Sequence, residues 1–362
     1  MPADESTVKT PTDHVFLGNL YLFYAFDVGE EINLDKLRES GSVTSLPLVL
    51  PKYFKDYHIP LAVELPHPHA TSRCISAKLY NFGAISLTYK IPFESTLEKL
   101  RKDLIGIENK FQEQSIIDAG TLFKRLKQFT TRPKFFQTKS SYLLIQVDTA
   151  ALNIESTLLK ELYGSVIASA LRFETKMLSE YQKNEILESA TGYFRGDLIV
   201  IDTEAAFIYD AEYEEILDLF EFANIQYLEL RYFDRVLDNQ LNILYEEESR
   251  KVPLKACIPF IGTLSSNQVD DLGKLKVDIS VITERLENSI KLGGEPYFSE
   301  LYALLNDKLD LTNWKETIER KLTIVHDIRS VLQHKIDSIR EDILTTLIIV
   351  LIIIELLVGI MR

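Results

Sequence analysis

The chain has 362 residues, of which 46% are hydrophobic and 26% are charged, and its formal net charge is −14. These proportions are ordinary for a folded chain, and the length leaves room for about two domains. The negative charge repels nucleic acids and acidic lipids, so contact with either requires a local basic patch.

The opening stretch, MPADESTVKTPTD, is acidic and polar. It has neither the basic and then apolar run of a secretory signal nor the arginine-rich composition of a mitochondrial presequence. We therefore expect residues 1–19 to form a polar tail, and the soluble part to stay in the compartment where it is made. The two cysteines, Cys74 and Cys257, lie far apart in sequence, which favours free core thiols in a reducing compartment over a disulfide.

Residues 20–150 alternate the signals of strands and helices. A short helix is predicted over Asn33–Arg38, with Asn33 as its N-cap, and a second helix from Pro92 through Leu104. With the strands, the order is β-α-β-β-α-β, which predicts a ferredoxin-like α/β domain interrupted by a proline-rich loop over residues 41–72. The four predicted strands are Leu20–Phe26, Arg73–Tyr80, Ala84–Lys90 and Ser141–Val147.

Residues 151–342 are predicted to be mainly helical. A helix over Ser156–Gln182 precedes a short hairpin near residues 197–209. A long helix then covers Glu212–Glu248, and a shorter helical segment covers residues 270–291. Another long helix is predicted to begin at Asn313, with Glu316 completing its capping box.

Both long helices carry apolar residues at alternating spacings of four and three, which is a heptad pattern. Asp234 fills one step of the first pattern, and Arg329 fills one step of the second. We predict a helical bundle or antiparallel coiled coil in which these two side chains form a register-setting ion pair. In the alternative arrangement Phe233 and Ile328 take the inner places, and both charges lie in solvent.

The run Leu344–Met361 reads LTTLIIVLIIIELLVGIM and holds one charged residue, Glu355. As a helix it would span roughly 27 Å, close to the hydrocarbon thickness of a bilayer. We predict a single transmembrane helix over residues 343–361, with a buried helix of a soluble hairpin as the alternative. Lys335 and Arg340 precede the run, which favours the cytoplasmic side for the soluble part.

Glu355 has three interpretations. A carboxylate inside the hydrocarbon region is costly, so it is expected to bond a helix of a neighbouring subunit. It would otherwise reach water at the far interface, or line a path for ions or protons.

The C-terminal half resembles a known family. Glu295-Pro296 and Leu301-Tyr302 precede a long helix with Lys321-Leu322, and this helix runs into an isoleucine-rich span with one glutamate. These features are similar to the required-for-meiotic-nuclear-division family, also called domain of unknown function 155, mainly over residues 155–361. The resemblance implies a single-pass, homo-oligomeric membrane protein without established catalytic residues, whose eukaryotic relatives support translation at the mitochondrial inner membrane. Without a presequence, a bacterial inner membrane fits better, with the mitochondrial membrane as the alternative.

The stretch Phe123–Lys139 is basic and contains no acid, which is unusual in so acidic a chain. Interleaved phenylalanines would stack on bases or enter lipid headgroups, so RNA, a ribosome or an anionic membrane surface is a candidate partner. In the alternative interpretation the charges form a solvated helix face and the phenylalanines point into the core. The basic residues are Lys124, Arg125, Lys127, Arg132, Lys134 and Lys139.

Four acids cluster around the predicted hairpin: Asp197, Asp202, Glu204 and Asp210. Grouped carboxylates hold Mg²⁺ in nucleases, so a metal-dependent hydrolase or nuclease is the alternative function. Turns are also rich in acids, and no catalytic lysine or histidine accompanies these four. The histidines offer no third ligand with recognisable spacing, either at His67 and His69 or at His326 and His334.

Taken together, the sequence predicts an α+β fold: an α/β region, a helical bundle and a C-terminal span. We expect a membrane-anchored, non-enzymatic scaffold that forms homo-oligomers and tethers translation or another machinery. No catalytic residue, cofactor or metal ligand is assigned, and no small-molecule substrate is identified. Phosphate-binding glycine loops and nucleophile elbows are missing from the sequence.

Overall fold

The fold is described from a computed structural model that covers residues 14–29, 31–46, 60–65, 73–136, 139–150, 154–249 and 296–360. It divides into two compact units, and each is described by itself. The first unit comprises residues 1–229 and 285–312, and the second comprises residues 230–284 and 313–362. The prediction of a mixed α+β fold is confirmed, because a large mixed sheet and several helices make up the described chain.

The first unit is built on a seven-stranded sheet with the order β3-β4-β5-β1-β7-β9-β8. All neighbours are antiparallel except β7 and β9, which are parallel. A separate two-stranded sheet pairs β2 (Glu31–Ile32) with β6 (Thr130–Thr131). The large sheet consists of β1 (Phe16–Asp27), β3 (Leu61–Ala62), β4 (Cys74–Tyr80), β5 (Ala84–Ser95), β7 (Lys139–Val147), β8 (Leu198–Ile201) and β9 (Ala205–Tyr209).

The four strands predicted from residues 20–150 are neighbours in this sheet, as β4, β5, β1 and β7. The sheet does not stop there, because β9 pairs with β7 and the hairpin of β8 and β9 extends the same sheet. A four-stranded ferredoxin-like pattern therefore does not describe the whole sheet. The expected domain boundary near residue 150 likewise falls inside the first unit.

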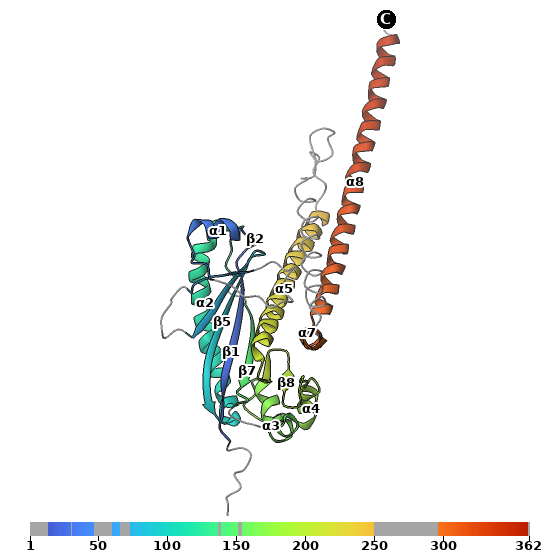
Figure 1. The fold of residues 1–362 in the computed structure, drawn as a ribbon. Coiled ribbons are helices and arrows are strands. Elements are labelled where there is room, and N and C mark those ends of the chain that lie inside the picture. Colours follow the sequence, from blue (N-terminus) through green and yellow to red (C-terminus); the bar gives the residue numbers. More distant parts are fainter. Residues whose placement is uncertain are drawn as a thin grey trace, which may run out of the picture. The chain divides into compact units, whose positions relative to one another are not determined.

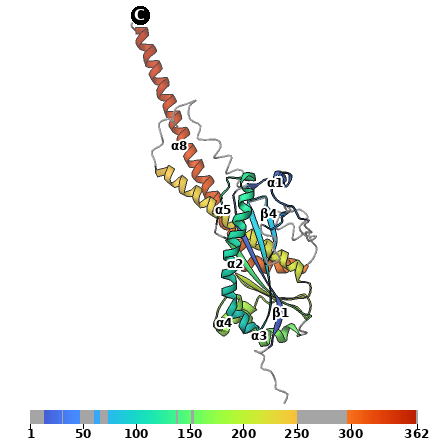
Figure 2. The ribbon, with the colours of Figure 1, turned by 90° about the vertical axis from the view of Figure 1, so that its left-hand side faces the viewer.

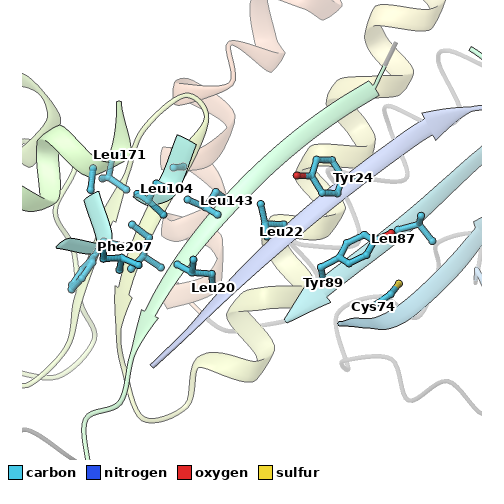
Figure 3. Close-up of a cluster of buried hydrophobic side chains, with 14 of the residues drawn as sticks. Leu20, Leu22, Tyr24, Cys74, Leu87, Tyr89, Leu104, Leu143, Leu171 and Phe207 are labelled. Atoms are coloured by element: carbon cyan, nitrogen blue, oxygen red, sulfur yellow. The ribbon is translucent and has the colours of Figure 1, made fainter. Parts of the chain in front are cut away.

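One face of the sheet is covered by α2 (Leu97–Leu126), α3 (Ser156–Leu171) and α4 (Glu180–Leu187). In Figure 2, α2 lies in front of the strands. Alternate strand residues point to this side, as the pleat requires, and pack on the helices as one apolar cluster. Figure 3 shows part of the cluster: Leu20 and Leu22 of β1, Leu143 of β7, Phe207 of β9 and Leu104 of α2.

The other face of the sheet carries the first half of α5 (Tyr213–Ser249). Here the intervening strand residues are buried, and Tyr142 of β7 packs against Phe220 of α5 with 5.4 Å between ring centroids. Helix α7 (Pro296–Lys308) joins this layer, because the Tyr302 hydroxyl donates a 2.6 Å hydrogen bond to Oε1 of Gln226. The first unit is therefore a sheet between two helical layers, a common way to bury both faces.

Local chemistry explains several element boundaries. Asn33 caps α1 (Leu34–Ser40) as predicted, and its side chain accepts the N–H of Lys36 at 2.9 Å. The helix expected from Pro92 is wrong at its start, because β5 continues to Ser95 and Thr96 caps α2. Strand β4 pairs with β5 only as far as Tyr89. At Pro92 no described strand lies on that side of β5, so the N–H group that proline lacks is not needed there for a hydrogen bond. A single-turn 3-10 helix, η3 (Lys127–Phe129), follows α2.

Two helical predictions are corrected. The helix expected over Ser156–Gln182 is interrupted between α3 and α4, where Phe173 adopts a φ of 55°. That backbone conformation does not continue an α-helix. The long C-terminal helix, α8 (Leu311–Ile360), begins before Asn313, so Asn313 lies inside the first turn and is not the N-cap.

The second unit contains the end of α5 and most of α8, which run in the same direction in Figures 1 and 2. The antiparallel arrangement was therefore wrong for this pair. A heptad pattern does not fix the relative direction of two helices, and residues 250–295 and α7 lie between α5 and α8 in the sequence. The segment 270–291 lies outside the described residues, as do Cys257, His67 and His69.

Candidate functional site

The end of α8 is the most unusual surface in the described chain. Its segment Asp337–Ile360 has 24 residues and is long and apolar enough to cross a membrane. None of its most apolar window is buried within the chain, and the isoleucines from Ile348 to Ile354 are 50–55% exposed. A core helix of a soluble protein would have these side chains packed, so the buried-hairpin alternative finds no support in this chain.

Glu355 lies within this exposed segment. Gly359 stands one turn further on, and a Cβ placed there would meet no atom within 4 Å. Residues four apart share one face of a helix, so the carboxylate and the glycine lie on the same side of α8. Each of the three interpretations of Glu355 therefore requires something outside the described chain to contact this face of α8: a neighbouring subunit, water, or ions and protons.

The predicted pair of Asp234 and Arg329 is replaced by a different contact within the second unit. Nζ of Lys321 lies 2.6 Å from Oδ1 of Asp234 and 2.6 Å from Oδ1 of Asp238. Asp234 therefore does bridge the two long helices, but its partner lies two turns earlier on α8 than Arg329. The register assumed for an antiparallel pair does not apply to helices that run in the same direction.

The basic stretch divides into a solvated set of charges and a set of inward rings. Phe123, Phe129 and Phe135 pack against the apolar cluster, and the rings of Phe123 and Phe135 stack at 5.6 Å. These three rings are not presented to bases or headgroups, whereas the centre of the Phe136 ring lies 4.5 Å from Nζ of Lys134. The charges form an exposed group, which we call the basic rim: Lys124, Arg125, Lys127, Arg132 and Lys134.

Lys139 differs from the basic rim. Its Nζ lies 3.8 Å from Oε1 of Glu108 and 4.7 Å from the centre of the Tyr24 ring. Burial lowers the pKa of Lys139 to about 8, although the Glu108 carboxylate opposes this shift. This lysine is a partly buried cation at the start of β7, and it is not available to a large anionic surface.

The four acids near the hairpin do not converge. Asp202 is buried beside the turn and forms an ion pair with Arg172, while Glu204 is exposed. Asp197 and Asp210 flank the other end of β8 and β9, and Asp197 accepts the N–H of Phe194 at 2.7 Å. Among the described residues, no group of three His, Cys, Asp or Glu side chains is placed to hold a metal ion. His326 and His334 are both exposed on α8.

A buried ionic cluster beneath α5 was not predicted from the sequence. Nζ of Lys78 on β4 lies 2.6 Å from Oε2 of Glu221, and the Ser86 hydroxyl donates to Oε1 of Glu221 at 2.6 Å. Asp218 lies 3.3 Å from the same lysine. Burial alone would lower the pKa of Lys78, but the two carboxylates raise it above its ordinary value. The signal in the sequence was a lysine at a strand position facing a helix, which becomes informative only once the pairing is known.

A second buried polar contact lies on the opposite face of the sheet. The Tyr89 hydroxyl donates a 2.6 Å hydrogen bond to Oδ2 of Asp118, and Gln114 donates to Oδ1 at 2.9 Å. Cys74 lies in the same region, and burial raises the pKa of its thiol to about 12. Such a thiol is protonated at neutral pH and is a poor nucleophile. This arrangement holds α2 to the sheet and does not resemble an activated cysteine.

The chain belongs to the family described as "Uncharacterized protein MJ0711, N-terminal domain", whose model matches residues 17–215. The match begins in β1 and ends at the start of α5, so it contains the whole large sheet except Phe16, the first residue of β1. It does not reach α8. The resemblance to the required-for-meiotic-nuclear-division family concerns a different family and stays a prediction.

A relative from Methanocaldococcus jannaschii, described as "Uncharacterized protein MJ0711", is 24% identical over 201 residues. The aligned part is 55% of this chain and 60% of the relative, which is less than two thirds of that protein's length. No solved structure matches the chain. The comparisons therefore define the family of the first unit and leave its function to be argued from the molecule.

Proposed function

We propose that this protein is a membrane-anchored, non-enzymatic scaffold that spans the bilayer once through the end of α8. The observation that carries the proposal is one continuous helix, Leu311–Ile360, whose last part is apolar and unpacked. At about 1.5 Å per residue, its 24-residue candidate span is roughly 36 Å long, enough for a hydrocarbon core of about 30 Å with some tilt. Exposed to water, these side chains would have a large unfavourable free energy.

Lys335 and Arg340 lie just before the apolar run, and this supports a cytoplasmic location for the remainder of the chain. A cell membrane of a bacterial type is the location that we propose. The helix face with Glu355 and Gly359 supports self-association, because a small residue allows close approach and a polar side chain gains a partner in lipid. The scaffold would thus be a homo-oligomer.

The basic rim supports a contact with an anionic lipid surface. Its five charges are exposed at the end of α2 and in the loop after it. Attraction of exposed lysine and arginine to acidic lipids requires no aromatic insertion. RNA recognition is less well supported, because base stacking needs accessible rings and three of the four neighbouring phenylalanines pack against the core.

The anchor is tested by membrane extraction. The full chain and a chain that ends at Asp342 are expressed in a bacterial host, and both membrane fractions are washed with high salt and then with alkaline carbonate. The full chain is expected to need detergent for release, and the shortened chain is expected in the aqueous fraction. Release of the full chain by salt alone would contradict the anchor.

The basic rim is tested separately with vesicles. Binding of the shortened chain to vesicles with phosphatidylserine is compared with binding to neutral vesicles, before and after Lys124→Glu and Lys127→Glu together. We expect binding to the acidic vesicles to fall on charge reversal and to weaken as salt is added. Unchanged binding would remove the rim from the proposal, and binding to RNA in place of vesicles would assign it to nucleic acid.

A further inference from the structure

A short loop in the first unit presents two aromatic rings to solvent. We call residues 191–199 the aromatic loop. Tyr193 is 63% exposed and Phe194 is 66% exposed, and their ring centroids lie 4.7 Å apart in an edge-to-face arrangement. Tyr297 at the start of α7 extends the group, with its ring 5.1 Å from that of Tyr193. Aromatic side chains of this size gain free energy when they are buried, so a group of them in the open marks an interaction surface.

The aromatic loop is held by its own hydrogen bonds. Thr191 and Ile199 exchange two backbone hydrogen bonds of 2.8 and 2.7 Å at its base. Within it, the N–H of Phe194 donates to Oδ2 of Asp197 at 2.7 Å, and the N–H of Asp197 donates to the carbonyl of Phe194 at 3.0 Å. A Cβ on Gly192 would lie only 2.4 Å from the carbonyl oxygen of Asp197, so this close approach requires glycine. A fixed loop loses little conformational entropy when it binds.

Acidic groups surround these rings. Asp210 is buried, and it accepts the N–H of Glu212 at 2.8 Å and a long 3.5 Å bond from the Tyr297 hydroxyl. Burial raises the pKa of Asp210, and the nearby charge of Asp197 adds to the rise. Burial also raises the pKa of the Tyr297 hydroxyl, and the charges of Asp210, Asp197 and Glu300 add to the rise. The loop itself carries one exposed cation, Arg195, and the four nearby acids outnumber it: Asp197, Asp210, Glu212 and Glu300.

The geometry points to the aromatic loop and Tyr297 as a docking surface for a basic segment of a partner protein. A guanidinium group can stack on the face of Tyr193 or Phe194 while the surrounding carboxylates neutralise its charge. Tyrosine and phenylalanine are also enriched in the cores of protein interfaces. A lipid surface is a poorer fit, since the same carboxylates repel acidic headgroups.

The test uses the full chain in detergent and a short fluorescent peptide in which arginine alternates with leucine. Its binding is measured by fluorescence anisotropy, beside a peptide in which glutamate replaces each arginine. We expect the arginine peptide to bind, and the double variant Tyr193→Ser and Phe194→Ser to weaken it about tenfold or more. Asp197→Asn keeps an oxygen acceptor for Phe194, and it should weaken binding by a smaller factor. Tyr181→Ser is the matched control, because Tyr181 is 77% exposed on α4 and is not part of the loop.

Two results support the inference together: a loss confined to the loop variants, and thermal unfolding that is unchanged in them. Equal binding of the double variant or of the glutamate peptide would overturn it, as would no binding of the arginine peptide. A loop-dependent change in oligomer size without peptide binding would assign the surface to a second copy. Loop-dependent binding to neutral vesicles would assign it to a membrane. Either of the last two outcomes would also overturn the inference.

Discussion

Two helical regions of this molecule are rich in apolar residues, but these residues are buried in one region and exposed in the other. Residues 216–230 of α5 are buried on almost every side, against the sheet on one face and near α7 on another. Residues 344–360 of α8 are exposed along their whole length. The two regions are alike in their content of apolar residues, but they differ in burial. The region in α5 completes a protein core, whereas the region in α8 needs an apolar environment from outside the described chain.

The carboxylates of the two regions differ in the same way. Glu221 in α5 is 4% exposed and is compensated by the ammonium group of Lys78 and the hydroxyl of Ser86. Glu355 in α8 lies among apolar side chains of its own helix, on a surface open to other molecules. A charge inside a protein core is thus matched by groups from the same chain, and a charge on a membrane helix is expected to be matched by another molecule.

The largest predicted effect concerns the matched charge. Lys78→Met removes the cation and leaves Glu221 buried, so we expect the free energy of unfolding to fall by about 3 kcal/mol. A urea titration of the full chain in detergent at neutral pH measures it. In the double variant Lys78→Met and Glu221→Leu the uncompensated charge is gone, and much of the loss should be recovered. A single variant as stable as the parent would mean that the buried pair contributes nothing.

A smaller effect is predicted for Glu355 in the proposed membrane span. Glu355→Leu should weaken self-association in detergent several-fold, because a polar contact between helices is replaced by apolar contacts that lipid supplies equally well. Analytical ultracentrifugation at several detergent concentrations measures the association. Leu356→Ala on a neighbouring face is the control. If the oligomer is unchanged by Glu355→Leu, the carboxylate reaches water or another partner, and its contact between subunits is excluded.

A weaker effect still is expected within the second unit. Lys321→Met removes the contacts to Asp234 and Asp238, and its side chain is 20% exposed. A partly exposed pair of this kind stabilises by about 0.5–1 kcal/mol and is screened by salt. A double-mutant cycle with Asp234→Asn, measured at low and high salt, isolates the contact. A coupling energy near zero would mean that the contact between Lys321 and Asp234 does not stabilise the packing of α5 on α8.

The elements whose signals are local could be predicted from the sequence. The strands around residues 81–83, the cap at Asn33 and the long helix α5 follow from turn residues, capping chemistry and apolar period. The end of α8 was evident for the same reason, since a run of apolar residues needs no tertiary information. The start of α2 was misplaced because Pro92 is normally a helix-initiating residue. It is acceptable in β5 because, among the described residues, no strand pairs with β5 on its β4 side at this position.

Contacts between distant residues could not be predicted in this way. The partner of Asp234 depends on the direction of two helices that are separated by residues 250–295, and Lys321 and Arg329 are equally basic in sequence. The aromatic loop was missed because Gly192 and Gly196 read only as turn residues, and the exposure of Tyr193 and Phe194 follows from loop closure. Residue type predicts the kind of interaction, and the fold determines the partner.

The last predicted effect concerns Lys139, whose charge is intermediate between the two kinds compared above. Its Nζ is partly buried, with a carboxylate at 3.8 Å and an aromatic ring as its surroundings. Because burial lowers its folded-state pKa to about 8 from an ordinary 10.5, the unfolded chain binds more protons between these values. The contribution of Lys139 to stability should therefore rise as pH increases from about 8 to 10.5, and below pH 8 the full unfavourable term is present.

Lys139→Met should remove this rise and stabilise the protein at neutral pH, where the unfavourable term of the buried cation is fully present. Unfolding midpoints of the parent and the variant, measured between neutral pH and pH 10.5, should approach one another as the pH increases. Lys134→Met is the control, because Lys134 is exposed and belongs to the basic rim. A parent and a Lys139 variant that differ by a constant amount at every pH would show that Glu108 and Tyr24 compensate the cation fully. Lys139 would then belong with Glu221, as a charge whose partners all lie in its own chain.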